Sequence, residues 1–309
     1  MATAYFHHPD CERHDMGDDH PESPRRLSAI REHLQQTGLW EQLSLNEAEE
    51  AAHDELRRAH PDSYINQLEQ MTPSQGRVMA DPDTAMNPHT FRSAKLAAGS
   101  GIQAVNQVLT NQARNAFCAV RPPGHHAERS RTMGFSFFNN IAVAAQHALS
   151  FHHLERVVIL DFDVHQGNGT VDIFHHDPRV LMCSSFQHPF YPFTHSHGMP
   201  GHILNVQLAP GTDSATFRKA VTESWFEAIT AFDPQLILVS AGFDAHQLDP
   251  LAEVNLATDD YAWLTQQITR LAGELCRGRV VSMLEGGYHL QSLTEGVEAH
   301  IRGLLAAGK

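Results

Sequence analysis

Residues 157–170 have the sequence VVILDFDVHQGNGT, in which an apolar run changes abruptly into a polar one. The large aliphatic residues at the start of this stretch favour a short, buried strand. The polar residues that follow include Asp161, Asp163 and His165. Ligands of open parallel sheets bind at the carboxyl ends of strands. The stretch therefore predicts both a strand of an α/β sheet and one corner of a functional site.

Short apolar runs alternate with longer amphipathic segments along the chain. Proline suits the first turn of a helix, so Pro24 and Arg25 are expected to begin one. The other predicted helices cover residues 91–109, 141–151, 214–232, 259–276 and 290–305, and the predicted strands cover residues 116–120, 157–161, 180–184, 203–206, 236–240 and 280–284. This alternation predicts one α/β domain over residues 1–309, with a mainly parallel sheet that is covered on both faces by helices.

Composition excludes several classes of protein. The chain has 36 acidic and 22 basic residues, a net charge of -14, which argues against direct binding to nucleic acid phosphates. No apolar stretch approaches the roughly 18 residues that a membrane-spanning helix requires. The N-terminus lacks the basic and apolar regions of a secretion signal. The four cysteines are scattered and form no CxxC pair, so a reducing cytoplasm is expected. The oligomeric state stays open.

Polar clusters also follow three other predicted strands. They are RPPGHHAE at residues 121–128, SAGFDAH at residues 240–246 and EGGY at residues 285–288. Because the carboxyl ends of parallel strands meet at one edge of a sheet, these loops are expected to converge with residues 161–170 on one site.

The residue types in these loops suit a metal ion. Asp163 and His165 are two positions apart, so in an extended chain both side chains point to the same side. Asp244 leaves another strand end and could supply a third ligand. Three protein ligands and an open position describe a catalytic zinc site, although such an oxygen-rich set could also accept Fe²⁺ or Co²⁺. The alternative is that Asp163 and His165 only cap a helix; Asp244 and a nearby histidine pair argue against it.

Acid–base groups accompany the predicted ligands. His125 and His126 are adjacent after Pro-Pro-Gly, where one imidazole could take a proton from water and the other could donate one to a leaving group. Asp161 and Asn168 are plausible hydrogen-bond partners that would fix the histidine tautomers. Tyr288 follows two glycines, and its phenol could stabilise a developing oxyanion. The alternative for Tyr288 is a core tyrosine behind a turn.

Together with GFSFFN at residues 134–139 and HPESPRRL at residues 20–27, these strings resemble the histone deacetylase and acetylpolyamine amidohydrolase family. The resemblance extends from about residue 18 to residue 300 and is closest to the class II-like, stand-alone bacterial type. It implies an arginase-like fold with a parallel sheet of about eight strands.

The resemblance also implies roles for individual residues. His126 would be the main general base and acid, His125 its electrostatic partner, and Tyr288 the group that polarises the substrate carbonyl, with Asp161 and Asn168 completing the catalytic set. The implied ion ligands are Asp163, His165 and Asp244 for zinc, and Asp161, Ser184 and the backbone carbonyls of Asp163, His165 and Ser185 for a structural K⁺.

A narrow tunnel for the substrate is implied as well. Asp83 would grip the substrate backbone at the rim, and Arg26 would lie beside an internal exit for acetate. The remaining tunnel residues would be Gly134, Phe135, Tyr191, Leu251, Gly286 and Gly287.

The implied reaction is hydrolysis of the Nε-acetyl-lysine amide in proteins or peptides, giving lysine and acetate. An acetylpolyamine amidohydrolase would use the same chemistry on a substrate with a cationic end. Polyamine-selective class II relatives carry a glutamate just after an Asp-Pro pair, whereas here Leu251 follows Asp249-Pro250, which favours acetyl-lysine. Glu253 lies close enough to keep the polyamine alternative open. A catalytically silent acyl-lysine reader and a manganese arginase fit less well, because the catalytic set is intact and an arginase needs more metal-binding carboxylates.

Overall fold

The computed structural model describes residues 2–199 and 201–307 and contains one large sheet. Eight strands form this sheet, and every neighbouring pair runs parallel, which confirms the predicted parallel architecture. The order across the sheet is β2 (Ser44–Glu47), β1 (Thr3–His7), β5 (Asn115–Cys118), β10 (Val280–Leu284), β9 (Leu236–Ala241), β6 (Val157–Asp161), β7 (Val180–Gln187) and β8 (Ile203–Leu208).

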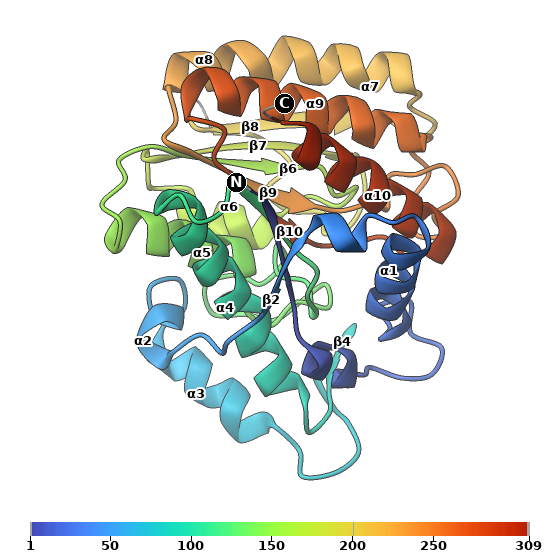
Figure 1. Ribbon diagram of the computed structural model, residues 1–309. Coiled ribbons are helices and arrows are strands. Elements are labelled where there is room, and N and C mark those ends of the chain that lie inside the picture. The colour runs from blue at the N-terminus through green and yellow to red at the C-terminus, as the bar shows by residue number, and fades with distance from the viewer. Residues whose placement is uncertain (1, 200, 308–309) are drawn as a thin grey trace.

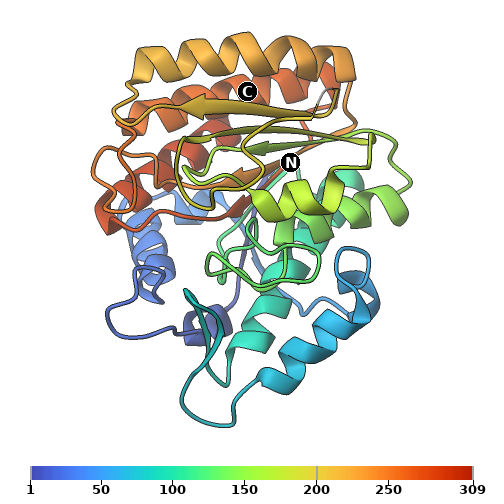
Figure 2. The ribbon, with the colours of Figure 1, turned by 180° about the vertical axis from the view of Figure 1, so that it is seen from behind.

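Helices cover both faces of the sheet (Figure 1, Figure 2). One face packs against α4 (Thr90–Leu109) and α5 (Asn140–Ser150). The opposite face lies under α7 (Ser214–Val221), α8 (Glu227–Phe232), α9 (Thr258–Leu275) and α10 (Leu290–Ala306), with α1 (Arg25–Gln36) packed against α10. Within the described residues, no helix is both long enough and apolar enough to cross a membrane.

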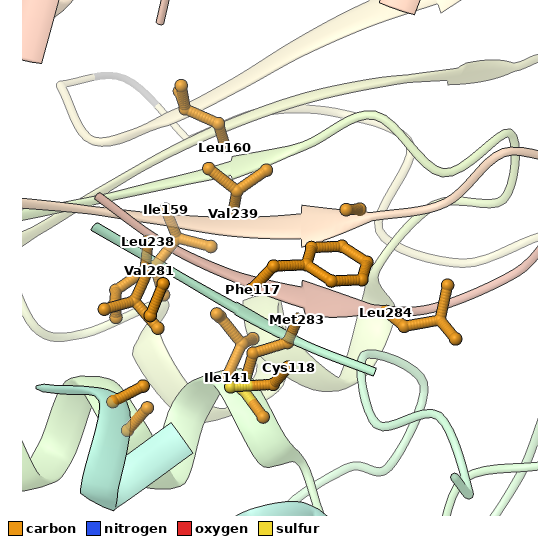
Figure 3. Packing of buried hydrophobic residues seen from close by; sticks show 14 of the residues in the cluster. Phe117, Cys118, Ile141, Ile159, Leu160, Leu238, Val239, Val281, Met283 and Leu284 are labelled. Carbon is orange, nitrogen blue, oxygen red and sulfur yellow. The ribbon is translucent and has the colours of Figure 1, made fainter. Parts of the chain in front are cut away.

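The central strands are buried on both faces, which explains their continuous apolar sequences. All five residues of β6 are buried, as are all five of β10. Leu160 and Val239 are register partners on one face, and Cys118 and Met283 are register partners that lie close to Ile141 of α5 in the core (Figure 3). Such strands lack the alternation of a half-exposed sheet, so the length of each apolar run is the main signal for them.

All six predicted strands and all six predicted helices are present, with ends displaced by a few residues in several cases. The helix predicted over residues 214–232 is interrupted by a π-helical turn at Thr222–Phe226. Elements that the sequence pattern missed are β1, β2, the hairpin of β3 (Val78–Asp81) and β4 (Thr84–Met86), and the helices α2 (His53–Leu56), α3 (Asp62–Met71) and α6 (Asn168–Phe174).

The strand order brings the four predicted polar loops together. From β6 the chain adds β7 and β8 outward on one side, and β9 and β10 then fill the space between β6 and β5. The strands β5, β10, β9 and β6 are therefore consecutive neighbours, and each one ends in a polar cluster. A site at their carboxyl ends lies where the strand order reverses, which is the usual ligand position in open α/β sheets.

Candidate metal centre and its pocket

Asp163, His165 and Asp244 form a compact cluster at the carboxyl edge of the sheet. One ligand atom from each residue lies within 4.8 Å of the others, and all three residues are buried. His165 Nδ1 is 3.1 Å from Asp163 Oδ1 and 3.1 Å from Asp244 Oδ2. Two ligand atoms on one tetrahedral zinc lie roughly 3–3.5 Å apart, since each bond is about 2.0–2.2 Å long. The three side chains therefore have the spacing of a shared metal site.

The electrostatics of the cluster also call for a cation. Asp163 Oδ2 accepts a hydrogen bond of 2.8 Å from Gly286 N, and Asp244 Oδ1 accepts one of 2.8 Å from Val164 N. These bonds leave one oxygen of each carboxylate directed towards His165. Burial and the neighbouring Asp163 carboxylate raise the pKa of Asp244 to about 7, because two buried anions repel each other. A divalent cation would remove this repulsion, so the donor set fits a metal ion.

Two glycines allow the backbone to come this close to the carboxylates. A Cβ atom on Gly286 would lie 2.1 Å from Asp244 Oδ2, and one on Gly242 would lie 2.2 Å from Asp163 Oδ2. Any side chain at either position would displace a ligand of the candidate site. The glycines in the post-strand sequences GFD and EGGY are thus explained by the space that the cluster needs.

The two adjacent histidines have different partners. His125 Nδ1 is 3.0 Å from Asp161 Oδ2, and His126 Nδ1 is 2.7 Å from Asn168 Oδ1, with the two ring centroids 4.0 Å apart. The amide nitrogen of Asn168 donates to Glu128 Oε1 at 2.8 Å, so its oxygen faces His126. His126 Nδ1 must then carry the proton, which leaves Nε2 of the neutral ring free to accept one.

Burial and charge separate the two imidazoles further. Burial lowers the pKa of His126 well below its ordinary value, and His125 and His165 lower it more. Burial alone would also lower the pKa of His125, but the carboxylates of Asp161 and Asp163 outweigh it and raise that pKa well above the ordinary value. The arrangement thus pairs a neutral histidine with a cationic one.

A pocket of about 160 Å³ leads to the cluster. Five of the seven predicted tunnel residues line it: Asp83, Gly134, Phe135, Tyr191 and Leu251. Its described lining consists of Asp83, His126, Gly134, Phe135, His165, Phe190, Tyr191, Leu251 and Tyr288. Because His126 and His165 both reach this pocket, a group bound in it would meet the acid–base pair and the candidate metal site together.

Tyr288 is part of the lining of this pocket. Its ring lies edge-on to Phe135, with centroids 6.0 Å apart. Among the described residues, none forms a hydrogen bond with the Tyr288 hydroxyl. Burial raises the pKa of Tyr288 well above its ordinary value, and the Asp244 carboxylate adds to this shift. The phenol is therefore a protonated donor that is available to a bound group.

Two of the predicted tunnel residues lie outside the described pocket lining, and one lining residue was not predicted. Gly286 and Gly287 are not part of the described pocket lining; Gly286 lies beneath the metal cluster instead. Phe190, which the sequence reasoning missed, lines the pocket and stacks on His165 with centroids 5.4 Å apart. Arg26 is completely buried, and its Nε donates to Gly287 O at 2.8 Å.

Arg26 belongs to a buried ionic network whose other members the sequence reasoning missed. Glu22 accepts a hydrogen bond of 3.0 Å from Arg26 and a second of 2.6 Å from Arg121. The Arg26 guanidinium also lies 5.2 Å from the ring centroid of Tyr288. Glu22 belongs to the string HPESPRRL and Arg121 to the string RPPGHHAE. Their sequence positions do not reveal that these charged side chains are buried and paired.

Glu285 connects two of the post-strand loops. Its buried carboxylate accepts hydrogen bonds of 2.7 Å from Gly124 N and 3.1 Å from His125 N. The loop after β10 therefore supports the backbone of the histidine pair, which follows β5. Glu285 belongs to the EGGY string, but no local sequence pattern indicates this contact with residues 124 and 125.

Ser184 stands beside the cluster on β7, in register with Asp161 of β6. It is fully buried, and its hydroxyl has no hydrogen-bond partner among the described residues. A buried hydroxyl without a hydrogen-bond partner costs free energy of folding. The Ser184 hydroxyl therefore suits contact with an ion or a water molecule. The residues that were expected to supply the other K⁺ ligands, Asp161, Asp163, His165 and Ser185, are also buried.

Comparisons with known proteins place the chain in a family. The family model of the histone deacetylase domain matches residues 20–304. The chain is 39% identical over 308 residues to histone deacetylase 10, chloroplastic, of Oryza sativa subsp. japonica, a match that covers 93% of this chain and 70% of the rice protein. It is 36% identical over 329 residues to the polyamine deacetylase HDAC10 of Homo sapiens, covering 99% of this chain and 48% of the human protein.

A solved structure has the same architecture. The crystal structure of the HDA15 HD domain superimposes with a TM-score of 0.92 at 32% sequence identity, and the match covers 99% of this chain and 89% of that one. The agreement therefore includes the sheet, the helices on both faces and the length of the domain. With a family match over most of its length, the chain belongs to the histone deacetylase family of hydrolases.

Proposed function

We propose that this protein is a zinc-dependent deacetylase that hydrolyses Nε-acetyl-lysine in proteins or peptides to lysine and acetate. The observation that carries the proposal is the meeting of three groups at one narrow pocket. These groups are the buried Asp163, His165 and Asp244 cluster, the neutral imidazole of His126 and the unpaired hydroxyl of Tyr288. Each corresponds to a separate requirement of amide hydrolysis: an electrophile, a base and an oxyanion donor.

Asp163, His165 and Asp244 would hold the zinc ion, and Fe²⁺ or Co²⁺ could occupy the same ligand set. When bound, zinc supplies Lewis acidity that polarises an amide carbonyl and increases the acidity of water. His165 is part of the pocket lining, so a group bound in the pocket would lie beside this ligand set.

His126 is placed to move the proton. Its Nδ1–H is held by Asn168, so its Nε2 can accept the proton of the attacking water and later transfer a proton to the departing amine. His125, which is bonded to Asp161, places a positive charge beside the developing negative one. These roles make His126 the principal acid and base and His125 its electrostatic partner.

Tyr288 would donate a hydrogen bond to the oxygen of the tetrahedral intermediate. That bond strengthens as negative charge develops on the oxygen, so it lowers the barrier more than it tightens substrate binding. The Tyr288 hydroxyl forms no hydrogen bond with another described residue, which supports this role.

The pocket itself favours a slim side chain without charge. Phe135, Phe190 and Tyr191 supply aromatic walls, and Asp83 and Leu251 lie at the same pocket. Acetylation removes the lysine charge, so the acetylated side chain can enter such an apolar channel without the desolvation cost of an ammonium group. Asp83 already accepts hydrogen bonds of 3.1 Å from Gly134 N and 3.0 Å from the Tyr191 hydroxyl, and it would accept an amide N–H of the substrate backbone in addition.

We also propose a structural K⁺ beside the zinc. Its ligands would be Asp161, the hydroxyl of Ser184 and the backbone carbonyls of Asp163, His165 and Ser185. The buried, unpartnered Ser184 hydroxyl supports this site. A monovalent cation there would offset the concentration of buried carboxylates at the carboxyl edge of the sheet.

The cellular setting is part of the proposal. Residues 1–309 would act as one deacetylase domain in the cytoplasm, without direct binding to nucleic acid. The four cysteines Cys11, Cys118, Cys183 and Cys276 are all free and buried, which suits a reducing compartment. The acidic net charge of -14 would repel nucleic acid phosphates.

An acetylpolyamine is the second candidate substrate, because the human relative is named a polyamine deacetylase. Selection of its cationic end requires an acid near the pocket. Leu251 occupies the wall after Asp249-Pro250, and Glu253 is exposed and is not part of the described pocket lining. These positions favour acetyl-lysine over acetylpolyamines.

A competition assay tests the proposed substrate. Zinc-loaded protein is given an acetyl-lysine peptide together with acetylated putrescine, spermidine and cadaverine, and kcat/KM is measured for each by the release of acetate. We expect the peptide to have the highest value. A kcat/KM at least tenfold higher for any acetylpolyamine would make that compound the substrate. Absence of acetate release from every compound would contradict the proposed deacetylase activity.

Leu251→Glu is expected to shift the preference from acetyl-lysine peptide towards acetylpolyamine. The new carboxylate would face the cationic end of the polyamine across the pocket, and charge pairs of this kind act mainly on selectivity. The measurement is the ratio of kcat/KM values for the two substrates. Leu248→Glu is a matched control, because Leu248 is 50% exposed and is not in the described pocket lining. An equal shift in both variants would show that total charge, and not position, changes the preference.

A further inference from the structure

The peptide group that joins Gly287 to Tyr288 is held at both of its polar ends. Its carbonyl oxygen accepts a hydrogen bond of 2.8 Å from Arg26 Nε, and its N–H donates one of 2.7 Å to Asp249 Oδ2. We propose that Asp249 is a positioning residue for the proposed reaction: it fixes the backbone of Tyr288 so that the phenol points at the reacting carbonyl. This inference rests on the function proposed above.

The contacts of Asp249 are almost entirely with backbone amides. Besides Tyr288 N, its carboxylate accepts hydrogen bonds of 3.2 Å from His289 N and 3.1 Å from Leu251 N. Asp249 is only 6% exposed, and it forms no ion pair with any side chain that the structure describes. A buried carboxylate with three backbone donors and no cation is stabilised only while those amides stay in place. Asp249 therefore holds a specific local conformation.

The backbone before Tyr288 has few other restraints on its conformation. Gly286 and Gly287 precede Tyr288, and Gly287 has a φ of +122°, which L-residues with side chains rarely adopt. The Tyr288 hydroxyl has no bond to a described residue, so the phenol itself does not anchor the side chain. The direction of the ring is therefore set by the backbone, and the bond from Asp249 is one of the two that restrain this peptide group.

Asp249 also joins the catalytic phenol to the pocket wall. Its Oδ1 binds the amide of Leu251, while its Oδ2 binds the amides of Tyr288 and His289. Leu251 and Tyr288 both line the pocket. One carboxylate thus sets the relative positions of a wall residue and of the proposed oxyanion donor.

The effect of replacing Asp249 is easier to interpret than the effect of replacing Arg26. Arg26 is fully buried and paired with Glu22, which also pairs with Arg121, so its replacement would leave uncompensated charges in the core. Removal of Asp249 leaves three amides without an acceptor but no unpaired cation. Its effect on turnover can therefore be separated from a general loss of structure.

The test is a double-mutant cycle with wild type, Asp249→Ala, Tyr288→Phe and the double variant, all zinc-loaded. Steady-state kinetics with an acetyl-lysine peptide give kcat and KM, and zinc content and melting temperature are measured for each protein. We expect Asp249→Ala to lower kcat by about 10- to 100-fold, the scale of a displaced reacting group, with KM changed less than about threefold. In the Tyr288→Phe background the same replacement should lower kcat by less than about threefold, because the group it positions is already gone.

Two further variants complete the design. Asp249→Asn keeps one acceptor oxygen and should recover part of the lost kcat, and it replaces Asp249→Ala in the cycle if that protein does not fold. Asp260→Ala removes another buried carboxylate at the start of α9, one that accepts a hydrogen bond of 2.9 Å from Ala257 N and pairs with Arg218 at 2.7 Å. It should lower the melting temperature and should have the same small effect on kcat whether residue 288 is Tyr or Phe.

An equal loss of kcat from Asp249→Ala in both backgrounds would overturn the inference, because the residue would then act through the fold and not through Tyr288. An unchanged kcat in the wild-type background would overturn it too. Failure of the proposed function has a different signature: wild-type protein with full zinc content would release no acetate from any acetylated substrate.

Discussion

Asp244→Ala is expected to abolish both stoichiometric zinc binding and amide hydrolysis. Asp244 supplies one of the three ligand atoms that lie within 4.8 Å of one another, and two remaining protein ligands do not make a catalytic zinc site. Without the metal, the pocket keeps its acid–base groups but loses the group that polarises the amide carbonyl. The measurements are zinc per chain after dialysis and the rate of acetate release at saturating peptide.

The fold should survive this replacement. Burial and the neighbouring Asp163 carboxylate raise the pKa of Asp244 to about 7, so removal of one of these two buried carboxylates takes away a repulsion from the metal-free protein. In the presence of a chelator, the variant should therefore melt close to wild type. Asp259→Ala, at an exposed position in the first turn of α9, should retain full zinc content and activity. If Asp244→Ala kept wild-type zinc content, the assigned ligand set would be wrong.

Tyr288→Phe is expected to lower kcat by about 10²–10³-fold, the usual effect of removing one oxyanion donor. Phenylalanine has nearly the same shape, so the pocket walls and the contact with Phe135 should persist. The hydroxyl forms no hydrogen bond with any described residue, so its loss removes no bond of the folded protein. KM, zinc content and melting temperature should then change little.

The opposite pattern would identify a packing residue. A core tyrosine that loses a buried hydrogen bond costs about 1–3 kcal/mol of stability, and turnover would be nearly normal in the protein that remains folded. A variant that melts early and retains wild-type kcat would therefore contradict the oxyanion role of Tyr288.

The sequence was sufficient to predict six of the eight strands of the sheet, because the central strands are buried on both faces. The apolar run of residues 157–160 and the sudden change at Asp161 are visible without any structure. The outer elements lack this signal. In β2, for example, three of the four residues Ser44–Glu47 are exposed, and an edge strand of this kind has no apolar run to reveal it. The hairpin of β3 and β4 is likewise short.

The site was predicted in part for the same reason. Asp163, His165 and Asp244 each lie within four residues of a strand end, so parallel strands were enough to suggest that they meet. The contacts of Asp249 and Glu22 could not be predicted in this way. Asp249 acts on an amide 39 residues further along the chain, and Glu22 pairs with Arg121, which is 99 residues away. Contacts of that kind depend on loop paths, for which no local sequence pattern exists.

The position of β10 has a consequence for how the protein is made. This strand lies between β5 and β9, yet it is the last of the eight to be synthesised. Until residues 280–284 have left the ribosome, β5 and β9 each carry a free edge with unpaired backbone groups, and exposed edges of this kind promote association between chains. The same strand carries Glu285 and Tyr288 at its end. Closure of the sheet and completion of the site are therefore one late event, and a nascent chain that stops before β10 has neither.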